Sequence, residues 1–278
     1  MNTVHYDSEG ARLAYCHSGS GVPVVFLHPT PLDHRYWLPL VERLEGIRAI
    51  VPDLRGHGAS ELGATLAAGD FTAVPDAPVL SMERLAKDVL VLLDSLQIEK
   101  AVFVGCSIGG YVLLELWRQA PQRMRGLVFV CSKPQPDAPA NVERRAVTIA
   151  QARAGKREML FDGMLQSLTG VTSRQRRPQI IPELRATMTP TAEALVVVQA
   201  GLATRPDSLP TVVTITVPVL AIAGDEDPGV TPQDMRAFRN APGGCEFHTL
   251  AEAGHLAAYE QPENVALWLA PWLRQFKG

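Results

Sequence analysis

The stretch GCSIGG, residues 105–110, places one serine between glycines at the point where an apolar run ends and a helical pattern begins. The apolar run is AVFV at 101–104, and the helical pattern continues through YVLLELW at 111–117. A strand that turns sharply into a helix needs small residues on both sides of the turn, because neighbouring backbones pack closely there. The pattern predicts that Ser107 lies at a strained turn with its side chain exposed at the edge of a sheet. A serine that only caps a helix beside glycine is the alternative.

Further apolar runs of strand length lie on both sides of this turn. They are continuous rather than alternating, which is typical of strands buried on both faces of a sheet. Helical patterns separate them, so the strands should pair in parallel through right-handed crossovers. The predicted fold class is α/β, with a mostly parallel central sheet flanked by helices. The runs lie at 22–29, 47–53, 101–105, 126–131, 217–224 and 245–250, and the helical patterns at 81–96, 107–120 and 262–276.

Local signals mark where three other segments begin and end. Residues 4–7 and 12–17 flank a Ser-Glu-Gly turn and predict an opening hairpin. Ser81 precedes the first helical pattern and is a suitable N-cap. Residues 61–80 are rich in Ala, Gly and Pro and predict a long loop, which is either functional or a surface excursion.

Residues 134–213 interrupt the alternation of strands and helices. They contain no buried-strand run, have mostly helical propensity and are punctuated by prolines. We therefore expect a helical cap at 134–213, inserted into an α/β core made of residues 1–133 and 214–278. The cap is rich in arginine, and Phe161 is its only aromatic residue.

Composition limits the classes of function. The chain has 278 residues, 46% of them hydrophobic, and a formal net charge of −3. No basic block stands out beyond the short stretch at 174–177, so nucleic acid is not an expected partner. No secretory signal and no membrane-spanning run is visible, so we expect a cytoplasmic protein without a membrane partner. The sequence does not indicate which oligomeric state the protein adopts. The cysteines are scattered without metal-like spacing and are expected to be free thiols: Cys16, Cys106, Cys131 and Cys245.

A serine hydroxyl becomes a good nucleophile only when a base removes its proton. His255 is the best candidate for that base, because it lies in a loop between the last strand and the last helix. His28 and His57 also follow strands, but they lie within turn signals and are expected to anchor loops by hydrogen bonds. We therefore pair Ser107 with His255.

The base in turn needs a carboxylate that fixes its tautomer. Asp225, Glu226 and Asp227 follow the strand at 217–224 and offer that group. The resulting chain order of serine, acid and histidine is the order that a nucleophile-elbow architecture uses.

Five stretches in this order resemble the α/β-hydrolase superfamily, in its capped branch of small hydrolases. The resemblance covers nearly the whole chain and is nearest to esterases and 3-oxoadipate enol-lactonase-like proteins. The stretches are FLHPTPLDHRYW at 26–37, VPDLRGHGAS at 51–60, GCSIGGYVLLELW at 105–117, VLAIAGDEDPGVTP at 219–232 and AGHLAAYEQPENV at 253–265.

The resemblance implies a role for each residue of the predicted triad. Ser107 is the nucleophile and His255 the general base. The acid of the family usually stands three residues past the glycine that ends the strand, which makes Asp227 the expected acid and Asp225 the alternative. Cys106 occupies the variable position of the elbow, where we expect a small buried side chain rather than a nucleophile.

The resemblance also implies an oxyanion hole formed by two backbone N–H groups, those of Thr30 and Ile108. Pro29 departs from the family, which usually has glycine there, but Thr30 keeps its own N–H. Pro31 restricts Thr30 as well, so we expect a stiff donor loop. The Thr30 hydroxyl is a possible contact for the substrate.

The expected reaction is hydrolysis of a small-molecule carboxylic ester or lactone through an acyl-enzyme on Ser107, with no metal and no organic cofactor. Two alternatives stay open: a hydrolase that cleaves carbon–carbon bonds of ring-fission products, and a ligand-binding member of the fold without catalysis. The arginines of the cap either bind a carboxylate of the substrate or lie on solvated helix faces.

Overall fold

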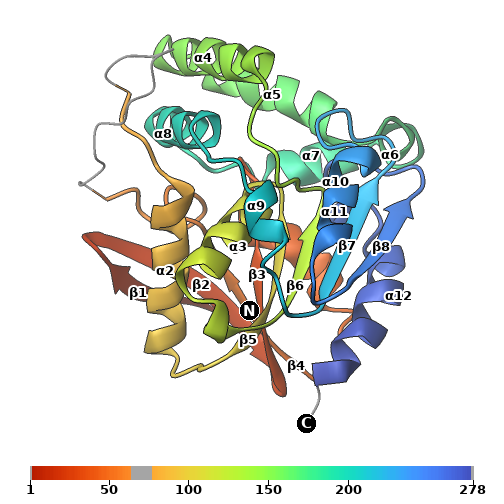
Figure 1. Cartoon of the computed structure of the whole chain (residues 1–278). Coiled ribbons are helices and arrows are strands. Elements are labelled where there is room, and N and C mark those ends of the chain that lie inside the picture. The colour runs from red at the N-terminus through yellow and green to blue at the C-terminus, as the bar shows by residue number, and fades with distance from the viewer. Residues whose placement is uncertain (1, 64–76, 277–278) are drawn as a thin grey trace.

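The computed structural model describes residues 2–63 and 77–276, and a twisted eight-stranded sheet runs through its centre (Figure 1). The strand order is β1-β2-β4-β3-β5-β6-β7-β8. The predicted strands are all present, within a few residues at their ends. The strands are β1 (Thr3–Ser8), β2 (Ala11–Gly19), β3 (Val22–Leu27), β4 (Ile47–Pro52), β5 (Ala101–Cys106), β6 (Met124–Val130), β7 (Val219–Gly224) and β8 (Cys245–Leu250).

The pairing of the strands confirms a mostly parallel sheet. The strands β1 and β2 form the predicted antiparallel hairpin, and β2 pairs antiparallel with β4. Every other neighbouring pair in the order is parallel. The carboxyl ends of β3 and β5 to β8 therefore meet at one edge of the sheet, which is where an open α/β sheet presents its ligand site.

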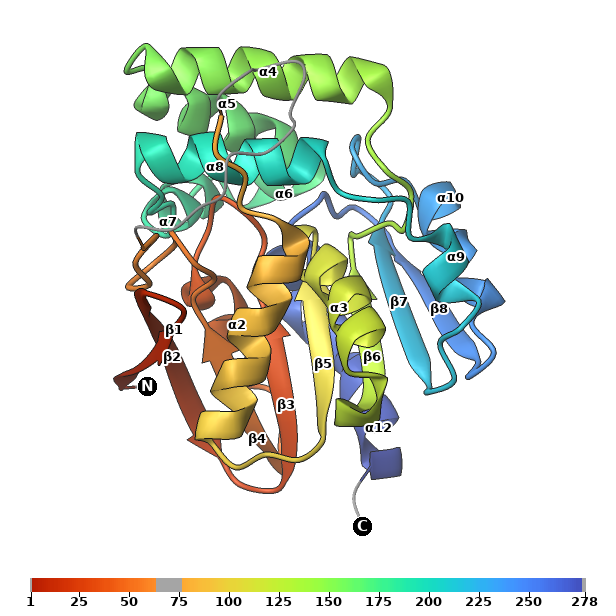
Figure 2. The same ribbon diagram turned by 60° about the vertical axis from the view of Figure 1, so that its left-hand side comes forward.

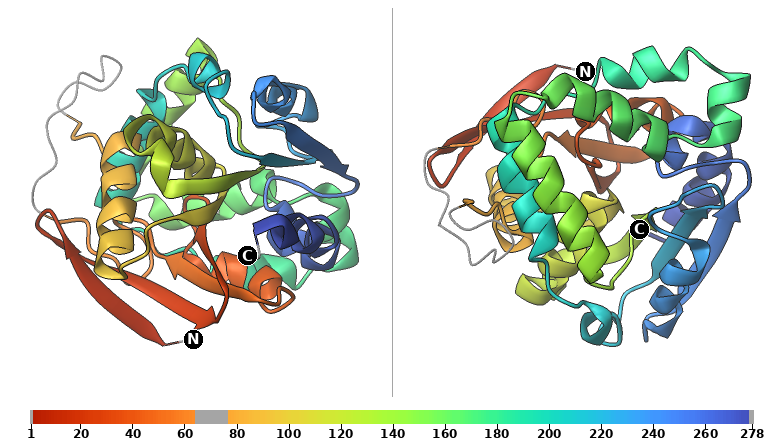
Figure 3. Two further views of the ribbon diagram at one scale, coloured as in Figure 1. Left: turned by 60° about the horizontal axis from the view of Figure 1, so that its bottom comes forward. Right: turned by 90° about the horizontal axis from the view of Figure 1, so that it is seen from above.

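Alternate side chains of the central strands supply two separate apolar cores, one on each face. Val24 and Phe26 of β3 belong to the core that also contains Trp37 and Trp272, whereas Val25 of β3 belongs to the other core. This alternation follows from the two-residue period of a strand. Helices α2 and α3 cover one face, and α1 and α12 cover the other (Figure 3, left).

The predicted helices at 81–96, 107–120 and 262–276 are confirmed as α2, α3 and α12. Ser81 caps α2 as expected, because its side chain accepts a hydrogen bond from the backbone N–H of Arg84 at 3.2 Å. No helix among the described residues is long and apolar enough to cross a membrane. The helices outside the inserted segment are α1 (Leu38–Val41), α2 (Met82–Ser95), α3 (Ile108–Gln119), α10 (Pro232–Met235), α11 (Ala257–Glu260) and α12 (Pro262–Leu273).

Residues 134–213, which we call the cap segment, are helical and lie between β6 and β7. The long helices of the segment sit above the carboxyl edge of the sheet (Figure 2), with α4 beside α8 (Figure 3, right). The division of the chain into core and cap stays a prediction. Most of the predicted loop at 61–80, namely 64–76, lies outside the described residues. The helices of the segment are α4 (Pro139–Arg153), α5 (Arg157–Leu168), α6 (Val171–Arg176), α7 (Ile180–Arg185), α8 (Ala192–Ala203) and α9 (Leu209–Val212).

Candidate active site

Ser107 lies at the turn between β5 and α3 in a backbone conformation that is rare for a residue with a side chain. Its φ is 53° and its ψ is −117°. The flanking glycines have no room for a Cβ: one built on Gly105 would lie 2.5 Å from the carbonyl carbon of Gly109, and one on Gly109 would lie 2.2 Å from the Leu27 oxygen. The close approach predicted from the sequence is therefore present, and it holds Ser107 at the carboxyl edge of the sheet.

Ser132, two residues past the end of β6, supports this turn. Its buried hydroxyl donates a hydrogen bond to the carbonyl of Ser107 at 2.9 Å, and its side chain occupies the space that a Cβ on Gly110 would need. Ile108 begins α3, so its backbone N–H is one of the donors that a helix leaves without an internal partner. Among the hydrogen bonds of residues 2–63 and 77–276, none uses the N–H of Ile108 or that of Thr30.

His255 and Asp227, the predicted base and acid, are in direct contact. The Nδ1 atom of His255 lies 2.6 Å from Oδ2 of Asp227, and both side chains are buried. The other carboxylate oxygen, Oδ1, accepts hydrogen bonds from the N–H groups of Gly229 at 2.8 Å and Val230 at 3.0 Å. The carboxylate is thus fixed by the backbone of its own loop. A proton held on Nδ1 leaves Nε2 of His255 as the basic nitrogen.

Burial and charge act in opposite directions on His255. Burial lowers the pKa of the imidazole, but the adjacent Asp227 carboxylate raises it by more, with a smaller contribution from Glu260, so that the pKa lies above its ordinary value. His255 therefore resembles the imidazole of a Ser-His-Asp arrangement, whose cationic form is stabilised by its carboxylate partner.

The two other acids of the loop after β7 have different surroundings. Asp225 is exposed, and Glu226 accepts hydrogen bonds from the backbone N–H of Thr172 at 2.9 Å and from its hydroxyl. Only Asp227 contacts the imidazole of His255 within the described part of the chain. The geometry favours Asp227 over the alternative acid, Asp225.

His28 and His57 anchor the loop that carries Thr30 by hydrogen bonds, and both are buried. The sequence predicted that they anchor loops. His28 accepts a hydrogen bond at Nε2 from the N–H of Leu54 at 2.9 Å, and its Nδ1 donates to Pro29 at 3.0 Å. His57 accepts at Nε2 from the Thr30 hydroxyl at 2.9 Å. Burial lowers the pKa of His28 to about 4 and that of His57 to about 3. Both imidazoles therefore stay uncharged near neutral pH and hold the loop by neutral hydrogen bonds. The Thr30 hydroxyl already forms one of these bonds, to His57.

Cys106 is a fully buried side chain, as expected, rather than an exposed thiol. Its sulfur lies 3.2 Å from the Tyr36 hydroxyl, and burial raises the pKa of the thiol well above its ordinary value. A thiol that stays protonated is a poor nucleophile. All four cysteines are free.

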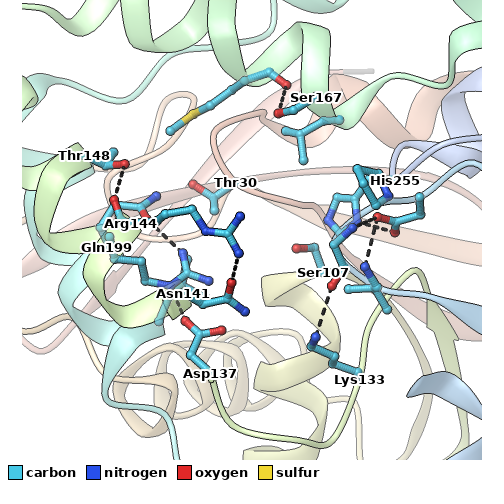
Figure 4. Close-up of a pocket in the computed structure, with 18 of the residues that line it drawn as sticks. Thr30, Ser107, Lys133, Asp137, Asn141, Arg144, Thr148, Ser167, Gln199 and His255 are labelled. Atoms are coloured by element: carbon cyan, nitrogen blue, oxygen red, sulfur yellow. Dashed lines mark hydrogen bonds and ion pairs between the residues drawn. The ribbon is translucent and has the colours of Figure 1, made fainter. Parts of the chain in front are cut away.

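A cavity of about 360 Å³ opens between the carboxyl edge of the sheet and the cap segment, and Ser107, His255, Asp227 and Thr30 all line it (Figure 4). Ile108 is buried and contributes no side chain to the cavity wall. The volume suits a small molecule. The structure therefore brings the predicted nucleophile, base and acid and one predicted oxyanion donor to one cavity, with the other donor directly after Ser107.

The cap side of this cavity is polar, which sequence reasoning did not localise. Asn141, Arg144, Arg145 and Thr148 of α4 line it, together with Gln199 of α8. Their spacing of three and four residues places the four on one face of a helix. That periodicity is visible in the sequence, but a polar face of this kind is also typical of a solvated helix. The packing of α4 over the sheet edge decides between the two.

Glu260 is a second residue that sequence reasoning missed. Its buried carboxylate accepts hydrogen bonds from Gly254 at 3.0 Å and Leu256 at 3.2 Å, the residues on either side of His255. It also accepts one from Gly170 of the cap segment at 3.0 Å, and burial raises its pKa. Its position five residues after His255 is the only sequence signal.

One group of possible metal ligands is present in the described residues, Asp33, His34 and Asp53. Both oxygens of Asp33 are bonded to the guanidinium of Arg35, and Asp53 bonds His34 at 2.8 Å and the backbone N–H of Ala59 at 2.9 Å. These atoms already have protein partners, so the group is a loop-fixing network.

Comparison with known proteins agrees with this architecture. The alpha/beta hydrolase family matches residues 24–266. The chain is 30% identical over 262 residues to a 2-succinyl-6-hydroxy-2,4-cyclohexadiene-1-carboxylate synthase of Salmonella arizonae, with 92% of this chain and 95% of the relative covered. It is 27% identical over 245 residues to 3-oxoadipate enol-lactonase 1 of Acinetobacter baylyi, with 87% and 84% covered. A thermophilic esterase from Thermogutta terrifontis superposes with a TM-score of 0.89 at 29% identity, with 100% of each chain covered. The sheet, the strand-to-helix turn and the family match together show that the chain belongs to the α/β-hydrolase family.

Proposed function

We propose that this chain hydrolyses a carboxylic ester or lactone through an acyl-enzyme on Ser107. The observation that carries the proposal is the contact of 2.6 Å between His255 Nδ1 and Asp227 Oδ2 beside a serine held at positive φ, all on one cavity. The esterase and enol-lactonase names of similar proteins support the same reaction class.

In this mechanism, Ser107 Oγ attacks the carbonyl carbon while His255 Nε2 takes its proton. The oxyanion that forms accepts hydrogen bonds from the backbone N–H groups of Ile108 and Thr30, which have no partner among the described residues. His255 then protonates the departing alcohol oxygen. A water molecule, deprotonated by the same imidazole, releases the acid and restores Ser107.

The proposal predicts that the purified protein releases p-nitrophenol from p-nitrophenyl acetate and butyrate and that Ser107→Ala abolishes this release. Losing the nucleophile of such an arrangement costs about 10⁶-fold in kcat. Cys106→Ala is the matched control, because it alters the neighbouring residue in the same turn and should retain turnover. Equal turnover by wild type and Ser107→Ala would refute the proposal.

The synthase relatives give a second candidate, because 30% identity over 92% of the chain is as high as for any relative described above. A folded wild-type protein that hydrolyses no ester or lactone would favour that reaction. The deciding measurement is then an assay for the synthase reaction after which those relatives are named. A folded protein inactive in both assays would favour a binding member of the fold.

A further inference from the structure

We infer that the cap side of the cavity is a subsite for one carboxylate group of the substrate, with Arg144 as its cation. This inference rests on the proposed function and narrows its substrate class to esters or lactones that carry a carboxylate. It concerns Arg144 in particular, and not the arginines of the cap segment in general.

Helix α4 turns its polar face toward the cavity. Its residues Asn141, Arg144, Arg145 and Thr148 face the cavity, whereas Ile149 and Ala152 are fully buried in the apolar core. The helix thus turns a polar stripe toward the space above Ser107, where an enzyme for purely apolar esters would gain from apolar side chains. A polar wall inside a cavity indicates a ligand with a polar group at that end.

The two neighbouring arginines of α4 have different partners. Arg145 is committed to Asp137 and to Gln199, whose Oε1 lies 2.8 Å away. The side chain of Asp137 is only 3% exposed, and its carboxylate also pairs with Arg205 at 2.8 Å. These contacts tie α4 to α8 and to the end of the cap segment. Arg145 is therefore a structural cation.

Arg144 is arranged differently. Among the described residues its guanidinium contacts the side-chain oxygen of Asn141, and no carboxylate pairs with it. Figure 4 shows Arg144 and Asn141 projecting together into the cavity, on the side opposite His255. A guanidinium beside an amide N–H₂ group offers planar donors that match a carboxylate.

The cavity wall carries a net positive charge. Three cations line it, Lys133, Arg144 and Arg145, against the two anions Asp137 and Asp227. The Lys133 ammonium is held by the carbonyl of Gly229 at 3.1 Å and lies 3.8 Å from Asp234 outside the wall. Arg144 is thus the cation that remains for a ligand. One available guanidinium suits a single carboxylate better than a phosphate dianion.

Apolar side chains line the same cavity. They are Met164 and Leu168 of α5, Leu202 of α8 and Val230. A substrate with a short hydrocarbon stem, an ester or lactone carbonyl at Ser107 and a carboxylate at Arg144 would complement all three parts.

The test compares pairs of esters that differ in one carboxylate. The first pair is 4-nitrophenyl hydrogen adipate against 4-nitrophenyl hexanoate, and the second is 4-acetoxybenzoate against phenyl acetate. The two pairs place the carboxylate on the acyl side and on the leaving-group side. For wild type, Arg144→Gln and Arg144→Lys, kcat/KM is measured for each ester. Arg153→Gln is the matched control, because Arg153 lies exposed on the same helix and does not line the cavity.

We expect wild type to prefer the carboxylated member of at least one pair. Arg144→Gln should lower that preference by about tenfold or more, since it removes a charge-assisted contact. The neutral esters serve as the reference within each variant, because the preference is the ratio of the two kcat/KM values, and Arg153→Gln should leave their turnover within about twofold. Arg144→Lys should recover part of the preference, and Arg153→Gln should keep all of it. A preference that is absent, or that is unchanged in Arg144→Gln, or that falls equally in Arg153→Gln, would overturn the inference.

A binding measurement separates failure of the subsite from failure of the proposed function. If wild type hydrolyses no ester, titration calorimetry with monomethyl adipate is performed on Ser107→Ala and on Ser107→Ala/Arg144→Gln. Binding that weakens by about tenfold in the double variant supports the subsite without any catalysis. Equal binding, or none, by both variants contradicts it.

Discussion

At the scale of single residues, two carboxylates act on His255 in different ways. Asp227 contacts the imidazole itself, whereas Glu260 holds the backbone on both sides of it. Asp227 thus favours one tautomer of the ring and stabilises its cationic form, and Glu260 fixes the position of the backbone that carries the ring. The proposed catalysis depends on both carboxylates, because a general base needs a suitable pKa and a correct position.

The raised pKa of His255 predicts a particular pH dependence. Only the neutral imidazole accepts the proton of Ser107, so kcat/KM for a neutral ester should fall as the pH drops through the pKa of His255. The Asp227 carboxylate outweighs burial and raises that pKa, which places the midpoint of the acidic limb above about 6.5, the ordinary value for histidine. Rates of p-nitrophenyl acetate hydrolysis between pH 5 and 9 measure the midpoint. A midpoint well below 6.5 would contradict the account.

Residue-level prediction from the sequence succeeded where backbone geometry dictates residue type. Gly105 and Gly109 have no room for a side chain, so the elbow could be recognised from six letters. The choice among the acids at 225–227 could not be made from the residues alone, because it depends on which side chain the loop after β7 turns inward. Glu260 was missed for a similar reason, since its role comes from hydrogen bonds to backbone groups that carry no sequence signal.

At the scale of elements, Glu260 joins the histidine loop to the cap segment, which is distant from it in sequence. It lies on α11, it holds the loop that carries His255, and it bonds the backbone N–H of Gly170 between α5 and α6. A direct backbone bond of 2.9 Å from the His255 N–H to the Leu168 carbonyl runs beside it. The cap segment and the histidine loop are therefore fixed to one another.

This connection predicts the behaviour of Glu260→Gln. The amide N–H₂ of glutamine would face backbone donors, so at least one buried donor loses its partner and the free energy of unfolding should fall by about 1–3 kcal/mol. Removing the negative charge should also lower the pKa of His255 and move the acidic limb of kcat/KM to lower pH. Urea denaturation and the pH profile measure the two effects.

The matched control is Glu263→Gln, which removes the same charge from a mostly exposed side chain at the start of α12. It should leave both the stability and the pH profile nearly unchanged. If the two variants behave alike, Glu260 has no special role in placing His255.

The sequence predicted the elements that have a regular burial pattern. It did not predict the orientation of α4, which depends on the helices and strands packed around it. The strands β3, β5 and β7 are almost wholly buried, and their continuous apolar runs identified them. The cap segment was recognised as helical, but α4 has only two fully buried residues, Ile149 and Ala152. Its sequence therefore contains little information on which face would meet the cavity.

At the scale of the whole molecule, the sheet and the cap segment each supply one side of the cavity. The carboxyl edge of the sheet supplies Ser107, Asp227 and His255, and α4 with α8 supplies the polar wall opposite them (Figure 4). The α/β fold followed from alternating strand and helix patterns, because those patterns reflect burial along the entire chain. The shape of the cavity did not follow, because it depends on how helices that are distant in sequence pack over the edge.

The central claim is that Ser107 forms a covalent acyl-enzyme. The most direct test is to mix the protein with p-nitrophenyl acetate, quench with acid within one turnover, and locate the adduct by mass spectrometry of the digested protein. We predict an acetyl group on Ser107 that is absent from the Ser107→Ala variant. Ester turnover without any adduct on Ser107, or an adduct on Cys106 in its place, would contradict the account.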